Sequence, residues 1–268
     1  MLQSELESAR QAIEALRLSH NALEARVEKM EDDALGAPSY CSDWTVGQLL
    51  SHLGSGAEIA LRTLERALIG RAPFERDVYP TIWDRWNALA AGDLTYDLLV
   101  WDRRHVSVLE GLDDTTVQDL HVELFGRQLD VAGLVSMRLG EHAFHSFDLV
   151  AHDNESAELL GSSVEVLIDL APTIAARLAR PGASEETKLI GVQTHAPART
   201  MVLSLGEAVT VTEIDPLPGT APSDNLELPA EAFLRLLYGR MDEAHTPASL
   251  TKSSGVDLDE LRRIFPGP

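Results

Sequence analysis

Cysteine is nearly absent from the sequence: Cys41 is the single one among 268 residues. One cysteine cannot form an intramolecular disulfide, and it excludes the cysteine-rich class of metal sites. A metal bound by this chain is therefore expected to be held by histidine and carboxylate ligands.

Basic side chains are also scarce, since 22 lysines and arginines stand against 43 aspartates and glutamates and the net charge is -21. Binding to a phosphate backbone depends on basic groups that displace counterions, and the sequence has no basic cluster of the kind that nucleic-acid readers carry. An anionic membrane surface is disfavoured for the same reason. We expect neither nucleic acid nor membrane as a partner, and we interpret the acidity as a solvated surface.

Long apolar runs are missing as well. No segment approaches the roughly 18 apolar residues that a membrane-spanning helix needs. The first residues, MLQSELESARQAIEALR, carry early acidic groups and lack the apolar stretch of a secretory signal, so a cytoplasmic protein is expected. The length suffices for one large domain or two smaller ones with a substantial core.

The first half of the chain has the periodicity of helices. Apolar residues recur at three- and four-residue steps, which predicts helices over residues 2–31, 45–69, 94–112 and 129–152. The segment 71–92 contains two prolines and two tryptophans and predicts a long connection with a short helix. Four helices with one long connection form a bundle, in which facing helices place ligands in a shared core.

The pattern changes after residue 155. We expect a helix near 163–179, strands over 188–193, 200–205 and 209–214, and further helices near 229–240 and 258–265. The fold class predicted is therefore α+β, with an N-terminal four-helix bundle over residues 1–155 and a small mixed α+β domain over residues 156–268.

The helix predicted over 129–152 carries four side chains that can bind metal. Glu141, His145, Asp148 and His152 fall on one arc of that helix, and buried ionisable groups are costly unless they are paired or bound to metal. Spacing does not choose among them. Glu141/His145 and Asp148/His152 share the same four-residue step, and chance accounts for two such pairs in a chain with 9 histidines and 43 acidic residues.

His52 lies among apolar residues of the helix predicted over 45–69, where a hydrogen-bonded core histidine is the ordinary interpretation. Gly54, Ser55 and Gly56 follow it. Each glycine inside a helix costs roughly 1 kcal/mol relative to alanine, so packing or function is expected to compensate. The small residues predict free space beside His52 for a ligand or substrate.

Several stretches together resemble the mycothiol-dependent maleylpyruvate isomerase family. Residues 41–46 (CSDWTV) and 49–53 (LLSHL) resemble its first metal-binding stretch, and 138–141 (RLGE) with His145 and 148–150 (DLV) resemble its second. Residues 236–240 (LLYGR) and 258–265 (LDELRRIF) resemble its closing segment. The resemblance implies a DinB-type four-helix bundle followed by a small α+β domain, which matches the division expected above.

The resemblance also implies the site residues. The metal ligands become His52, Glu141 and His145, and Asp148 becomes a residue that orients a ligand imidazole. His142 and His152 lose their claim. Arg240 resembles a substrate-binding position that holds a carboxylate or a sugar hydroxyl, although a surface arginine near a helix C-terminus explains it equally well.

Three protein ligands with an open fourth position are typical of catalytic zinc sites, and two histidines with a carboxylate also suit Fe(II). The resemblance implies zinc, mycothiol as the thiol cosubstrate and an actinobacterial source. A thiol that enters the open position loses its proton, and the thiolate is the useful nucleophile. It either adds reversibly to a double bond, giving cis-trans isomerisation, or forms a thioether by S-transfer to an electrophilic small molecule.

Two other functions stay open. The same fold can serve as a non-catalytic metal-binding, ligand-binding or regulatory protein, which would hold metal without ever forming a thiol conjugate or isomer. A hydrolase that activates water on the metal would turn over without thiol and would need Asp148 or His152 as general base.

Overall fold

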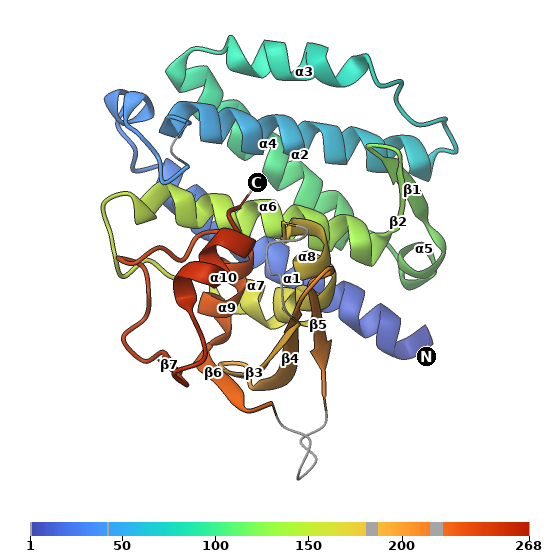
Figure 1. The fold of residues 1–268 in the computed structure, drawn as a ribbon. Helices are drawn as coiled ribbons and strands as arrows, with labels where there is room; N and C mark the ends of the chain where they lie inside the picture. The colour runs from blue at the N-terminus through green and yellow to red at the C-terminus, as the bar shows by residue number, and fades with distance from the viewer. Residues whose placement is uncertain (1, 42, 181–186, 215–221, 268) are drawn as a thin grey trace. The chain divides into compact units, whose positions relative to one another are not determined.

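The structure is a computed structural model that describes residues 2–41, 43–180, 187–214 and 222–267. The chain divides into two compact units, Met1–Asp153 and Asn154–Pro268. Figure 1 traces their elements: the first unit is built mainly from helices, and the second combines helices with a sheet. The predicted α+β class, a helical bundle followed by a small mixed domain, is confirmed.

Four long helices dominate the first unit, and shorter elements lie between them. α2 packs on α4, and α1 packs on α6, with further contacts from α1 to α4 and from α2 to α6. The four long helices are α1 (Leu2–Val27), α2 (Val46–Leu68), α4 (Ala91–Glu110) and α6 (Val131–Ala151). Within the part of the chain that the structure describes, no helix has the length and apolar content needed to cross a membrane.

Local sequence fixes where α2 begins and ends. Thr45 caps the helix, because its hydroxyl accepts a hydrogen bond from the Gln48 backbone N–H at 3.2 Å and the Gln48 side chain accepts one from the Thr45 N–H at 2.8 Å. This reciprocal pair is a capping box. At the other end, Gly70 has a φ of +66°, in the left-handed region that glycine adopts without strain. The register of His52 on α2 follows from these limits.

The connection between α2 and α4 contains α3 (Val78–Asn87), as the sequence predicts, and the 3-10 helix η1 (Asp32–Gly36) precedes α2. η1 was not predicted, nor were three elements between α4 and α6: the short helix α5 (Asp114–Asp119) and a hairpin of β1 (His121–Leu124) and β2 (Arg127–Asp130). The hairpin turns at Phe125 and Gly126, whose φ angles of 51° and 75° suit a turn with two residues in the left-handed region.

The second unit opens with a helical segment that is broken. The single helix predicted near 163–179 consists of α7 (Gly161–Leu167), the 3-10 helix η2 (Ile168–Leu170) and α8 (Ala171–Leu178). Pro172 explains the break, since it lacks a backbone N–H and is tolerated only in the first turn of a helix, which is where α8 carries it. Two more helices, α9 (Ala230–Leu237) and α10 (Leu258–Ile264), agree with the prediction within a few residues.

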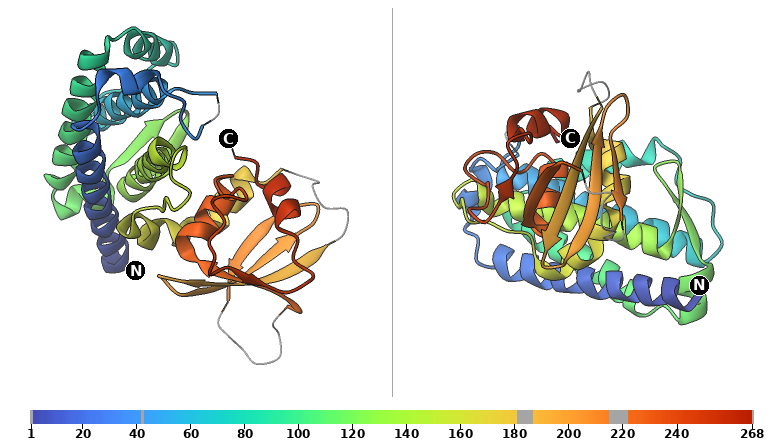
Figure 2. Two further views of the ribbon diagram at one scale, coloured as in Figure 1. Left: turned by 90° about the vertical axis from the view of Figure 1, so that its left-hand side faces the viewer. Right: turned by 60° about the horizontal axis from the view of Figure 1, so that its bottom comes forward.

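A five-stranded sheet forms the rest of this unit, in the order β5-β4-β3-β6-β7. β3 and β6 run parallel, and the other neighbours are antiparallel. Buried residues alternate with half-buried ones along β4 and with exposed ones along β6. α8 and α9 contact the sheet and cover one face of it (Figure 2). The strands are β3 (Lys188–His195), β4 (Arg199–Leu205), β5 (Thr210–Glu213), β6 (Asp224–Pro229) and β7 (Thr251–Lys252), of which β6 and β7 were not predicted.

Candidate metal site

His52 on α2 and Glu141 and His145 on α6 converge at one point of the first unit. The His52 Nε2 lies 2.7 Å from the Glu141 Oε2, and the His145 Nε2 lies 3.5 Å from the same oxygen. One ligand atom from each residue lies within 4.8 Å of the others. The side chains are 39, 44 and 12% exposed respectively, so the cluster opens to solvent on the His52 and Glu141 side.

Charge is concentrated in this cluster. Burial opposes ionisation of Glu141, but hydrogen bonds from His145 and His52 outweigh it and lower the pKa of the carboxyl group. Burial likewise opposes protonation of His145, yet hydrogen bonds with Asp148, Cys41 and Glu141 raise the pKa of its imidazole to about 10. The carboxylate is therefore ionised at neutral pH and available to bind a cation.

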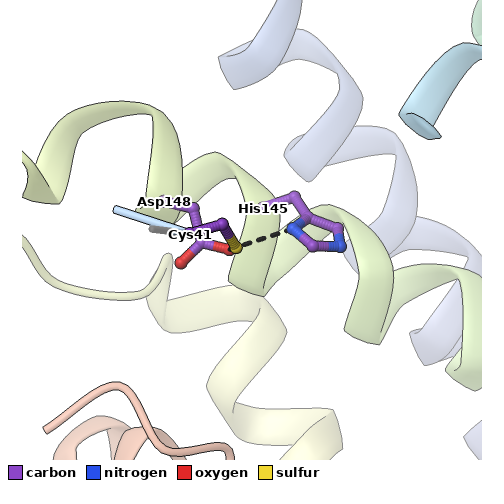
Figure 3. A group of neighbouring side chains, drawn as sticks. All are labelled: Cys41, His145 and Asp148. Atoms are coloured by element: carbon purple, nitrogen blue, oxygen red, sulfur yellow. Dashed lines mark hydrogen bonds and ion pairs between the residues drawn. The ribbon is translucent and has the colours of Figure 1, made fainter. Parts of the chain in front are cut away.

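Asp148 supports His145 from behind. Its Oδ2 lies 2.9 Å from the His145 Nδ1 and accepts a hydrogen bond from the Cys41 thiol at 3.0 Å. Figure 3 shows the three side chains turned toward one another, Cys41 from the segment before α2 and the other two from α6. Asp148 is fully buried, and its backbone carbonyl accepts a hydrogen bond from the Tyr40 N–H at 3.0 Å. These contacts hold Tyr40 and Cys41 against α6.

The donor set fits a divalent metal. Donor atoms about 2.1 Å from a tetrahedral metal lie about 3.4 Å from one another. The 3.5 Å between His145 and the Glu141 oxygen matches that spacing, whereas His52 and Glu141 are at hydrogen-bond distance, 2.7 Å, and would have to separate slightly to admit a metal. A carboxylate behind a ligand imidazole is also the usual arrangement around bound metal. Cys41, His145 and Asp148 form a second group with metal-binding atoms in reach of one another. In that group His145 would bind the metal through Nδ1. This nitrogen would then lose its present hydrogen bond with Asp148.

Two cavities adjoin His52. The larger has a volume of about 770 Å³, and Gln48, Ser51 and Asn87 contribute polar groups to its wall while Trp44 and Trp83 contribute aromatic ones. The smaller has a volume of about 170 Å³ and includes Glu141 in its wall. Trp83, which is 41% exposed, lines both cavities.

Free space adjoins His52 and the small residues after it, as predicted, but the two glycines also make room for neighbouring side chains. A Cβ on Gly54 would lie 2.1 Å from the Trp86 ring, and a Cβ on Gly56 would lie 2.8 Å from the Arg138 Nη1. The first glycine thus makes room for a buried indole, and the second for a guanidinium. The free space beside His52 is that of the two cavities; Ser55 lines both, and Gly56 lines the smaller one.

Residues 16–150, half of the chain, match the family model of the mycothiol maleylpyruvate isomerase N-terminal domain. The chain belongs to this family. Two solved structures are similar to the chain at 17% identity, each over 96% of this chain and 95% of the other. One is the mycothiol-dependent maleylpyruvate isomerase, with a TM-score of 0.59, and the other is a variant of that enzyme with a histidine replaced by alanine, with a TM-score of 0.60. At this identity the two structures show a shared fold. Among curated proteins, none matches the sequence.

Membership of the maleylpyruvate isomerase family confirms the resemblance inferred from the sequence, and the family is one of enzymes.

The structure shows the surroundings of two further candidate residues, His152 and Arg240. His152 is the C-cap of α6, its Nε2 lies 3.9 Å from Asp153, and it belongs to neither group of possible metal ligands among the described residues. Arg240 in the second unit is buried, and its Nη1 donates a hydrogen bond to the Tyr238 carbonyl at 2.8 Å. Its contact with substrate stays a prediction.

A buried polar network in the bundle core was missed by the sequence reasoning. Asp102 on α4 is fully buried, and it contacts the His20 Nδ1 at 2.7 Å, the His142 Nε2 at 2.9 Å and the Arg138 Nη2 at 3.0 Å. These partners outweigh the burial that would raise the pKa of Asp102, and its pKa lies well below the ordinary value. His142, which the resemblance removed from the ligand set, therefore has a structural partner. We refer to His20, Asp102, Arg138 and His142 as the Asp102 network.

His105 lies in the same buried region without a hydrogen bond. It is 0% exposed, and neither ring nitrogen has a partner among the described residues. Burial, assisted by the charge of Arg138, lowers the pKa of His105 to about 3. Its imidazole is consequently neutral at physiological pH, and acidification below the ordinary value of 6.5 favours the unfolded chain, in which this group takes up a proton.

Proposed function

We propose that the protein is a metal-dependent isomerase that uses a low-molecular-weight thiol, mycothiol, to interconvert the cis and trans forms of an electrophilic small molecule such as maleylpyruvate. The observation that carries the proposal is the convergence of His52, Glu141 and His145 beside two cavities in a chain of this family. His52, Glu141 and His145 are the proposed ligands of the metal, which is zinc in this proposal because the reaction is redox-neutral.

A bound divalent metal supplies a positive centre that favours the thiolate form of a thiol at neutral pH. The chain's own residues do the rest. Glu141 contributes the negative charge that holds the cation, and Asp148 keeps the His145 Nδ1 engaged, so that Nε2 faces Glu141. Trp44 packs beside both imidazoles, with ring centroids 5.1 Å from His52 and 5.9 Å from His145. It therefore restricts rotation of the two ligands.

The larger cavity suits the thiol. Its volume of about 770 Å³ falls in the range of roughly 300 to 1,000 Å³ that is usual for ligand sites. Ser51 donates a hydrogen bond to Asn87 at 2.7 Å, and both line this cavity with Gln48. These groups offer hydrogen-bond partners to the sugar hydroxyls of mycothiol, and the exposed face of Trp83 offers a surface on which a sugar ring can pack.

Purified, metal-loaded protein tests the proposal directly. With mycothiol and maleylpyruvate, we expect the trans isomer to form without net consumption of thiol, and we expect no reaction when mycothiol is omitted. Net consumption of thiol would instead indicate an S-transferase. Turnover without thiol would support the hydrolase. Stoichiometric metal with neither an isomer nor a conjugate from a panel of electrophiles would support a non-catalytic binding protein. Metal analysis of the same preparation distinguishes zinc from iron.

Replacing Asp148 with asparagine is expected to weaken metal binding by about 10- to 100-fold, the usual effect of losing a carboxylate behind a ligand imidazole. The neutral amide has the shape of the carboxylate but lacks the charge that holds the His145 Nδ1–H. Competition with a chelator measures the affinity. Asp153→Asn is the matched control, since it makes the same chemical change on a side chain that is 94% exposed. Equal affinities of the two variants would contradict the role assigned to Asp148.

A further inference from the structure

The smaller cavity has apolar walls that come from α2, α3, α6 and the β1–β2 hairpin of the first unit. Ile59 on α2, Met137 on α6, and Leu124 and Phe125 at the tip of the β1–β2 hairpin line it. His52 and Glu141 line the same cavity. A ligand that occupies it therefore lies directly beside the proposed metal ligands.

One cationic group interrupts these apolar walls. Arg138, only 3% exposed, lines the cavity together with Gly56. Its Nη2 donates hydrogen bonds to the Leu53 carbonyl at 2.8 Å and to Asp102 at 3.0 Å. No hydrogen bond or ion pair between described residues uses Nη1. The Arg138 Nη2 is thus anchored in the bundle core, and Nη1 is left unpaired.

Gly56 keeps the unpaired nitrogen accessible. A Cβ at this position would lie 2.8 Å from Nη1, so any larger residue would displace or cover it. Glycine inside a helix costs roughly 1 kcal/mol relative to alanine. Open access to the Arg138 Nη1 explains why glycine occupies this position of α2.

A buried guanidinium with an unused N–H group calls for an acceptor, and a carboxylate is the one that it binds most strongly. The volume of the cavity limits the size of the ligand. An apolar cavity of about 150 Å³ is known to hold benzene, and the volume here is about 170 Å³. The cavity therefore accommodates a small molecule of roughly six to eight non-hydrogen atoms. The sugar-bearing thiol is too large for it.

We propose that this cavity is the subsite of the electrophile, and that Arg138 binds the carboxylate of an unsaturated acid through Nη1 while the apolar walls hold its carbon chain. The assignment of the ligand as a reactant rests on the proposed function. The anion site itself does not. The thiol occupies the larger cavity, which His52 also lines. Both reactants therefore meet at the proposed metal ligands.

Crotonate and its neutral analogue crotonamide, each with six non-hydrogen atoms, serve as probes. Both are titrated into the zinc-loaded full-length protein in the absence of thiol, with binding followed by ligand-observed NMR. We expect the wild type to bind crotonate about tenfold or more tighter than crotonamide, the difference that a charge-assisted hydrogen bond gives. The preference is expected to fall to about onefold in Gly56→Ala and in Arg138→Lys, with metal content unchanged.

Gly92→Ala is the matched control. It makes the same change inside a helix of the same unit, where a Cβ meets nothing within 4 Å, and it should retain the wild-type preference. No preference in the wild type would overturn the proposal. A full preference in Gly56→Ala would also overturn it, because the carboxylate would then bind without access to the Arg138 Nη1. If Arg138→Lys does not fold, Gly56→Ala decides by the same criterion.

The two proposals fail separately. A carboxylate preference that depends on Arg138, in a protein without thiol-dependent turnover, would count against the proposed function and leave the anion site standing. Thiol-dependent isomerisation in a protein without the carboxylate preference would support the proposed function and count against the anion site.

Discussion

Replacement of His52 with alanine is expected to lower the affinity for zinc by about 100-fold or more, because a four-ligand zinc site is worth roughly 10 to 16 kcal/mol and each ligand contributes a share of it. Helical content should stay unchanged. The His52 side chain is 39% exposed, so its removal leaves no closed cavity in the core. Alanine also has the highest helix propensity of all residues. Chelator competition gives the affinity, and far-ultraviolet circular dichroism gives the helical content.

Two further variants separate the candidate pairs on α6. His152→Ala should keep the metal, because His152 lies with Asp153 at the end of the helix. Glu141→Ala should lose it. Loss in the first variant with retention in the second would favour Asp148/His152 as ligands, and full metal occupancy in His52→Ala would show that the ligand assignment is wrong.

The spacing of residues along α6 predicts the helix and the face on which its metal-binding side chains lie. It does not identify which of these side chains are the ligands. Glu141/His145 and Asp148/His152 share one step, and the packing of α2 and of the segment before it against α6 distinguishes them. That segment places Cys41 on Asp148 and Trp44 beside His52 and His145. Contacts between segments 100 residues apart have no local signature. The family likeness supplied what the periodicity lacked.

The β1–β2 hairpin was missed for a local reason. Two-residue hairpin turns usually carry Asn-Gly or Asp-Gly, since both residues need positive φ. Here Phe125 occupies the first position with a φ of 51°, so the usual signal is absent. The alternation in HVEL and the glycine at position 126 were the available clues. The residue that obscured the turn is one of those that line the smaller cavity.

The Asp102 network was equally out of reach, because its members come from α1, α4 and α6. Each looks like an isolated polar residue in an apolar helix. Only the assembled bundle shows that one carboxylate serves two imidazoles and a guanidinium. The network also holds Arg138, and through it the bundle core meets the wall of the smaller cavity.

Asp102→Asn is expected to lower the free energy of unfolding at pH 7 by about 3 to 5 kcal/mol, since removing one partner of a buried ion pair leaves the other charge uncompensated. Arg138, 3% exposed, is the charge left behind. Urea unfolding of the metal-free proteins measures the difference. Asp114→Asn is the matched control: Asp114 pairs with Arg10 at 2.6 Å but is 69% exposed, so its loss should cost less than about 1 kcal/mol.

The pH dependence of this difference tests the cause. The folded-state pKa of Asp102 lies well below its ordinary value of 3.8, so its contribution to stability is fully present above pH 3.8 and is lost as the pH falls below that value. The gap between wild type and Asp102→Asn should therefore be constant from pH 7 to about pH 5 and should narrow only in stronger acid. The neutral His105, whose pKa is about 3, destabilises both proteins below pH 6.5. Its imidazole stays neutral in both folded proteins above about pH 5, so it leaves the gap unchanged in that range. A gap that widens as the pH falls through about 6.5 would instead assign part of the stabilisation to protonated histidines paired with Asp102, because such pairs contribute only below the ordinary histidine pKa.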